Sequence, residues 1–104
     1  MPVRCGPSCI RFVWRSQDFL DDHFRRHGAE VGARTLERYV EFAHETRRRG
    51  VRFTSRRSAR SRVGYYHLKS HRLVILTGDE ETVLSLSRRS TNYVRTLPDS
   101  TYGR

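Results

Sequence analysis

The sequence predicts an α+β fold in which two N-terminal helices pack on a small antiparallel sheet of three to four strands. Before residue 50, apolar residues recur every three to four positions, which is the period of an amphipathic helix. After Gly50 they alternate or run together over short stretches, as they do in strands. The 104 residues suit a single domain, and apolar residues make up 36% of the chain, which is enough for a small core.

The first helix is predicted to begin at Ser16 and to end at Gly28. Ser16 is a favourable N-cap, and Asp18 adds negative charge to the first turn, where the helix dipole favours it. Gly28 is a natural C-terminal stop. The residues that recur at helical spacing between these ends are Phe19, Leu20, His23, Phe24 and His27.

The second helix is predicted from Thr35, its N-cap, to Gly50, which stops it. Residues 47–49 are three arginines, and positive charge in a last turn complements the helix dipole. One face of this helix is apolar and is marked by Leu36, Tyr39, Val40 and Ala43.

Strands are predicted at residues 51–54, 63–68, 73–76 and 82–87, with a turn at residues 78–81. The Ser/Arg-rich stretch 55–62 is expected to be a link between strands that is mobile when no ligand is bound. Residues 1–15 are expected to form a flexible N-terminal segment. Residues 88–104 are expected to form an irregular tail, because Pro98 blocks a late helix.

Composition bears on the compartment in which the chain works. No apolar run approaches the roughly 18 residues needed to cross a bilayer, and no long apolar segment suggests a secretory signal. Cys5 and Cys9 are expected to be two unlinked thiols, with a strained disulfide or half a zinc site as alternatives. We therefore expect no membrane association and a cytoplasmic location, in the producing or the target cell, with secretion inside a larger protein left open.

The charge distribution is the clearest functional signal. The formal net charge is +10, and no acidic side chain occurs between Glu45 and Asp79. Polyphosphate is the commonest partner of such a surface, and arginine can grip phosphate with two hydrogen bonds. The alternative is a solvated basic face, although solubility is usually served by mixed charges. The residues of this region expected to bind RNA are Arg47, Arg52, Arg56, Arg60, Tyr65, Lys69 and Arg72.

His23 and His27 share one helix face, a spacing that can ligate a metal. Phe24, Arg25 and Arg26 lie between them, so the usual glutamate is absent and two cations disfavour a metal. Both histidines could instead form hydrogen bonds at the helix end. The remaining interpretation is proton transfer, because RNA can be cleaved without metal by a base, an acid and donors that stabilise the phosphorane.

The segment from Asp22 to Gly32, followed by Thr35 to Ala43, resembles the opening of bacterial polymorphic and contact-dependent inhibition toxin domains. These belong to the barnase/EndoU/colicin/RelE-like ribonuclease superfamily. Their usual form is a His-Phe-x-x-His-Gly stretch, an aromatic-Gly pair and then Thr-x-x-x-Tyr-x-x-x-Ala. Residues 57–66 and 83–87 are similar to later parts of the pattern, so the resemblance covers roughly residues 18 to 90.

The resemblance implies that His27 is the catalytic base or acid and that His23 assists it or packs beside it. Val31 replaces the family's aromatic residue before glycine, Ser87 stands where an aromatic is common, and Tyr93 is a candidate to supply that ring. Ser85 would take the place of a threonine hydroxyl, and Tyr66 would line the site. Arg57 or Arg62 would contact the scissile phosphate. The remaining catalytic residues implied in this way are Arg57, Arg62, Tyr66 and Ser85.

Together these features predict a metal-independent endoribonuclease toxin that needs no cofactor and cleaves RNA by attack of the 2′-hydroxyl. The resemblance implies tRNA or another structured RNA as substrate. It also implies an acidic immunity protein or antitoxin, because a free nuclease would harm its producer. Two alternatives stay open: a non-catalytic basic module that binds nucleic acid, and a basic protein that docks on an acidic protein partner.

Overall fold

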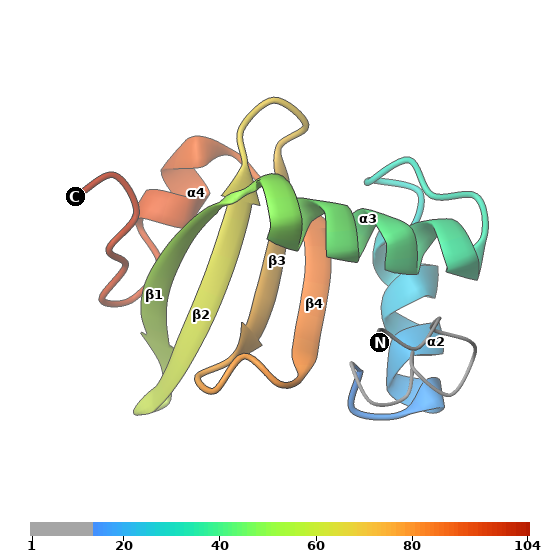
Figure 1. Cartoon of the computed structure of the whole chain (residues 1–104), viewed down its shortest axis with the longest axis horizontal. Coiled ribbons are helices and arrows are strands. Elements are labelled where there is room, and N and C mark those ends of the chain that lie inside the picture. Colours follow the sequence, from blue (N-terminus) through green and yellow to red (C-terminus); the bar gives the residue numbers. More distant parts are fainter. Residues whose placement is uncertain (1–13) are drawn as a thin grey trace, which may run out of the picture.

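The computed structural model describes residues 14–104, so the predictions for Cys5, Cys9 and most of the N-terminal segment 1–15 lie outside the described residues. Two helices precede four strands, and a short helix follows them (Figure 1). The elements are α2 (Gln17–His27), α3 (Leu36–Arg49), β1 (Val51–Arg57), β2 (Arg60–His67), β3 (Arg72–Thr77), β4 (Val83–Arg88) and α4 (Thr91–Arg95). The strands form one antiparallel sheet in the order β1-β2-β3-β4, which confirms the predicted α+β class.

The predicted ends of α2 and α3 are confirmed by their capping hydrogen bonds. The side chains of Ser16 and Thr35 each accept a backbone N–H three residues further on, at 3.1 Å. The N–H groups of Gly28 and Gly50 donate to carbonyl groups of the last turn of each helix. Both helix boundaries are therefore encoded locally.

The stretch 55–62 was predicted to be a mobile link, and this prediction is wrong. It contains the ends of β1 and β2, which pair down to Arg57 opposite Arg60. Ser58 and Ala59 form the turn with φ of 50° and 65°, the left-handed pair that a two-residue hairpin of type I′ requires. The usual Asn-Gly signal of this turn is absent, so the polar composition concealed a hairpin.

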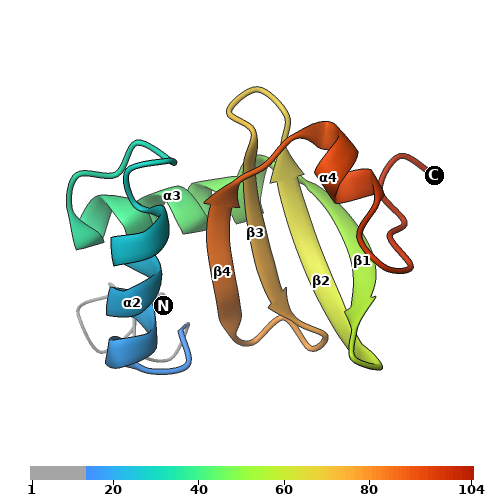
Figure 2. The ribbon, with the colours of Figure 1, turned by 180° about the vertical axis from the view of Figure 1, so that it is seen from behind.

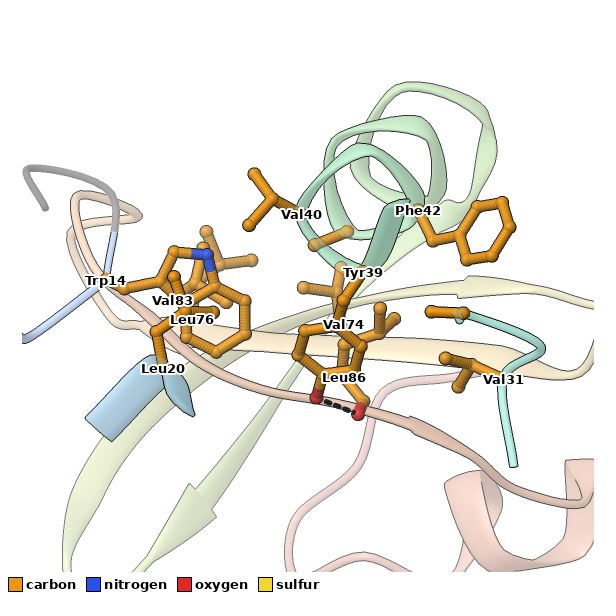
Figure 3. Packing of buried hydrophobic residues seen from close by; sticks show 12 residues of the cluster. Trp14, Leu20, Val31, Tyr39, Val40, Phe42, Val74, Leu76, Val83 and Leu86 are labelled. Carbon is orange, nitrogen blue, oxygen red and sulfur yellow. Dashed lines mark hydrogen bonds between the residues drawn. The ribbon is translucent and has the colours of Figure 1, made fainter. Parts of the chain in front are cut away.

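Helix α3 covers one face of the sheet and forms the main core with it (Figure 3). Tyr39 of α3 is fully buried, and its hydroxyl donates to the carbonyl oxygen of Leu86 at 2.6 Å. Trp14 lies beside β4, where it forms a parallel bridge with Val83. Further core residues from the helices and strands are Leu20, Val31, Val40, Phe42, Val74 and Leu76.

A second, smaller core lies on the opposite face of the sheet, beneath α4. Residues 88–104 were predicted to be irregular, whereas residues 91–95 are helical. The helix ends before Pro98, so proline limits its length without preventing it. After α4 the chain runs along the outer edge of β1, where Arg56 N–H donates to Pro98 O at 2.9 Å. The second core consists of Phe53, Tyr66, Leu73 and Val94.

Helices α2 and α4 lie at opposite sides of this second face, with β4 and β3 between them (Figure 2). Helix α2 runs beside β4, and α4 covers β1 and β2. The middle of the face is left without a covering helix, and this opening is where the candidate site lies. None of the helices in the described part of the chain is long and apolar enough to cross a membrane.

Candidate active site

A cleft of about 740 Å³ opens on the sheet face opposite α3. The residues that line the cleft come from β3 and β4 at its floor, from α2 at one wall, and from α4 and the segment that follows it at the other wall. Figure 2 shows how these elements are arranged. Leu73 and Ile75 give the floor an apolar centre, and Ser85 and Ser87 add hydroxyl groups beside it. The basic residues that line the cleft are Arg15, His23, Arg26, His27, Arg56, Arg57, Arg62 and Arg89. No acidic side chain of residues 14–104 lines it.

His27 lies at the end of α2, and its side chain is held by a carboxylate. Its Nδ1 is 3.1 Å from Oε1 of Glu30, and Oε2 of Glu30 accepts the backbone N–H of Arg88 at 2.9 Å. Burial raises the pKa of Glu30, but the hydrogen bonds from Arg88 and His27 outweigh this and leave that pKa below its ordinary value. An ionised carboxylate can only accept, so Nδ1 of His27 donates. Nε2 is then the nitrogen free to exchange a proton.

His23 lies one turn earlier in α2 and is buried, with 8% of its surface exposed. Its ring centroid is 4.3 Å from that of Phe19 and 5.8 Å from that of His27. Burial first, and then the charge of Arg26, lower the pKa of His23. A neutral imidazole in this packed position favours a role in the wall behind His27 over a role in proton transfer.

Arg57 and Arg62 reach the cleft from the end of the β1–β2 hairpin. They project from the same face of the sheet, because Ser55 pairs with Arg62 and side chains alternate along a strand. Neither arginine forms an ion pair with an acidic side chain among the described residues. Their charge is therefore available to an anion that enters the cleft.

Ser85 and Ser87 point from β4 to the same face, two residues apart. The hydroxyl of Ser87 accepts a hydrogen bond from Arg89 Nε at 3.2 Å. The guanidinium carbon of Arg89 lies 4.6 Å from the ring centroid of Tyr93. Tyr93 belongs to α4, lines the cleft wall that faces α2, and is 40% exposed. The cleft thus offers a flat cation and an aromatic ring, together with the half-buried hydroxyl of Ser85.

Tyr66 was expected to line the site, but it does not. It is fully buried in the second core, where α4 and the ring of Tyr102 cover it. Its hydroxyl donates to the carbonyl oxygen of Arg89 at 2.8 Å and lies 3.0 Å from His71 Nδ1. Tyr66 therefore supports the backbone of a cleft residue without touching the cleft itself.

The predicted RNA-binding residues do not form one surface. The strand register sends Arg52, Arg56, Tyr65 and Arg72 to the α3 face and Arg60 to the opposite face. Only Arg56 among them lines the cleft. Arg47, Arg52 and Tyr65 meet at Glu80 instead, with Arg52 Nη2 at 3.3 Å and Arg47 Nη2 at 3.9 Å from its carboxylate, and with the Tyr65 hydroxyl donating to it. Glu80 lies outside the acid-free stretch in sequence but folds back onto it.

The other three candidates are also placed away from the cleft. Arg72 donates to the carbonyl oxygen of Val31 at 2.8 Å, and its guanidinium carbon lies 3.7 Å from the ring centroid of Phe42. These contacts join the α2–α3 loop to the sheet, so Arg72 stabilises the fold and does not face the cleft. Arg60 and Lys69 are exposed, in the β1–β2 hairpin and the β2–β3 turn respectively.

Two residues of the candidate site were not foreseen from the sequence. Glu30 lies three residues after His27, and this spacing is a signal by which the pair could have been found. Arg89 carried no comparable signal, because its position depends on tertiary contacts with Ser87 of β4 and Tyr93 of α4. Among the described residues, no group of three or more histidine, cysteine, aspartate or glutamate side chains is placed to hold a metal ion. Comparisons of the chain with models of protein families, with curated proteins and with solved structures find no match.

Proposed function

We propose that the protein is a metal-independent endoribonuclease of the toxin type, which cleaves RNA by attack of the 2′-hydroxyl on the adjacent phosphate. The observation that supports this most is the cleft. Six arginines and two histidines line it, no described carboxylate does, and Glu30 holds one of the histidines from behind. A phosphodiester is the anionic group that such a cleft fits, and the histidine adds a side chain that can accept or donate a proton.

His27 is the base in the proposed reaction. Its Nε2 takes the proton of the 2′-hydroxyl, and the 2′-oxygen then forms a bond to phosphorus. The bond from phosphorus to the 5′-oxygen breaks, and this oxygen takes up a proton from a cleft hydroxyl or from water. The products are a 2′,3′-cyclic phosphate and a 5′-hydroxyl. DNA lacks the 2′-hydroxyl, so the same cleft would bind DNA without cutting it.

Arg57 and Arg62 are the groups proposed to stabilise the extra negative charge of the phosphorane. Donors that are in place before the reaction stabilise such charge without reorganisation, and a guanidinium can present two N–H groups to one phosphate. Ser85 adds a hydroxyl from the floor of the cleft. Arg89 and Tyr93 offer a flat surface on which a base next to the scissile phosphate can stack.

A structured RNA, with tRNA as the first candidate, is the proposed substrate, and an acidic immunity protein or antitoxin is the proposed partner. The net charge of +10 supports both, because each partner would bring negative charge to the arginines. The proposed place of action is the cytoplasm of the producing or the target cell.

The test is incubation of the purified protein with total RNA in EDTA, followed by sequencing of the cut ends. The expected result is cleavage that leaves a 5′-hydroxyl and a 2′,3′-cyclic phosphate. A 5′-phosphate end, or activity that appears only with added metal, would contradict the mechanism. Tight RNA binding with intact RNA would identify a non-catalytic binding module instead.

A further inference from the structure

A second groove, of about 560 Å³, lies beside the cleft and runs along the outer part of β1. Arg52 and Thr54 of β1, Ser61 of β2 and Asp99 of the C-terminal segment line this groove and not the cleft. Ser55, Arg56 and Arg62 line both. The groove and the cleft therefore meet near the turn of the β1–β2 hairpin.

Strand alternation explains how the two depressions reach opposite faces of the sheet. Arg52, Thr54 and Arg56 project to the side of α3, whereas Arg57 and Arg62 project to the side of the cleft. Helix α3 packs mainly on β2 and β3. The α3 side of β1 is thus free to take part in a polar groove.

The arginines at the junction carry charge that the described part of the protein does not neutralise. Arg56 donates to the carbonyl oxygen of Ala59 at 3.0 Å, and Arg62 donates to that of Ser61 at 3.2 Å. Neither has an ion-pair partner among residues 14–104. Carbonyl contacts orient a guanidinium but leave its charge. Arg57 and Arg60 also lie directly opposite each other, a like-charge pair that costs stability unless an anion sits nearby.

Further along the groove, the positive charge continues at Arg52. Its Nε and Nη2 both lie 3.3 Å from Oε2 of Glu80, so its position is fixed, and half of the side chain stays exposed. Arg47 shares the same carboxylate. One negative charge thus faces two positive ones, and the cluster keeps a net positive charge.

We propose that this groove is a second phosphate-binding site, which takes the RNA strand that leaves the cleft around the end of the β1–β2 hairpin. The proposal rests on the proposed function, because it assumes that the cleft holds RNA. It implies that the protein binds an extended single-stranded stretch more tightly than a fragment that only fills the cleft. Asp99 is the one acidic residue among the described residues that line the groove, and the phosphates would be bound by Arg52 and Arg56.

The test compares affinities for 2′-O-methyl RNA, which cannot be cleaved, by fluorescence anisotropy. Strands of about four and about twelve nucleotides represent a filled cleft and a strand that continues beyond it. The longer strand should bind more tightly to the wild-type protein. Arg52→Gln should weaken binding of the longer strand about threefold and leave binding of the shorter strand unchanged. For the longer strand it should also reduce, by about one, the magnitude of the slope of log affinity against log salt concentration. Asp99→Asn should strengthen binding of the longer strand.

Arg34→Gln is the matched control, since Arg34 is exposed, lies before α3 and lines neither depression. It removes the same charge and should affect both lengths alike. Equal effects of Arg52→Gln and Arg34→Gln would overturn the proposal, as would equal affinity of the two strands. The assay uses binding alone, so a protein that shows the length dependence but cuts no RNA would refute the proposed cleavage and keep the second site.

Discussion

Nδ1 of His27 lies 3.1 Å from Oε1 of Glu30, and the second oxygen of Glu30 is bonded to the backbone of Arg88 at the end of β4. One carboxylate thereby joins the last residue of α2 to the strand that carries Ser85. The ring of His27 is oriented relative to the sheet and not only relative to its own helix. Such a contact fixes which ring nitrogen carries the proton, as in other sites where a carboxylate orients a histidine.

The first prediction concerns Glu30. Glu30→Leu should lower kcat for RNA cleavage by about tenfold or more with little change in KM, because the ring loses its orientation while the arginines still bind substrate. Glu30→Gln should retain more activity, because the amide oxygen can still accept from Nδ1. Steady-state kinetics on one RNA provide the measurement. Equal kcat values for the Glu30→Leu and wild-type proteins would remove Glu30 from the mechanism.

The second prediction concerns His27. His27→Ala should abolish RNA cleavage and toxicity and leave the fold and the RNA affinity nearly intact, because the side chain is predicted to move a proton and not to bind phosphate. Cleavage assays in EDTA, growth assays and circular dichroism measure the three properties. A fully active His27→Ala protein would transfer the role to another histidine and count against the family resemblance.

The third prediction uses the lowered pKa of His23. The folded state holds the imidazole neutral to a lower pH than the unfolded chain does, so stability falls as pH falls from about 6.5 toward the folded pKa. His23→Leu should therefore lose less thermal stability than wild type between about pH 7.5 and 5. Melting temperatures by circular dichroism test this. Parallel pH dependences in the two proteins would show that His23 does not contribute.

The helices were predictable because their signals are local. Ser16 and Thr35 cap the residues directly after them, and glycine ends both helices. The β1–β2 hairpin was missed because its turn, Ser58-Ala59, lacks the usual turn residues and is held by the pairing of the strands on both sides. Local preference was overridden there by the sheet.

The candidate site was predictable in part, where residue type and order along the chain were sufficient. His27 and the hairpin arginines were identified by residue type and order, and the fold brings them to one cleft. The face to which Tyr66 projects was not assigned, so Tyr66 was placed in the site although it is buried beneath α4. Glu80 lies beyond the acid-free stretch, and only the β3–β4 turn returns it to Arg52. Such contacts depend on register and on tertiary packing, which residue order does not specify.

The fourth prediction is a steep salt dependence of RNA affinity. Each phosphate neutralised by an arginine releases counterions, so binding of uncleavable RNA should weaken by about tenfold or more between about 50 and 200 mM salt. Anisotropy titrations at several salt concentrations measure the slope. The His27→Ala protein should give the same slope, because the cationic side chains are unchanged. An affinity that stays constant over this range would contradict a phosphate-binding cleft.

The last prediction separates catalysis from charge at Arg57 and Arg62. Replacement of either by lysine keeps the positive charge but loses the planar fork that can hold two phosphate oxygens. If these arginines stabilise the phosphorane, cleavage should fall by about tenfold to a hundredfold while affinity for uncleavable RNA changes little, because only the transition state uses the full set of hydrogen bonds. Arg60→Lys is the control, since Arg60 lies in the same hairpin, opposite Arg57, but lines neither depression. It should leave both properties close to wild type. Parallel losses of cleavage and affinity in Arg57→Lys and Arg62→Lys would reduce both residues to electrostatic anchors, and the stabilising donors would then have to be sought at Arg26 or Arg89, which line the same cleft.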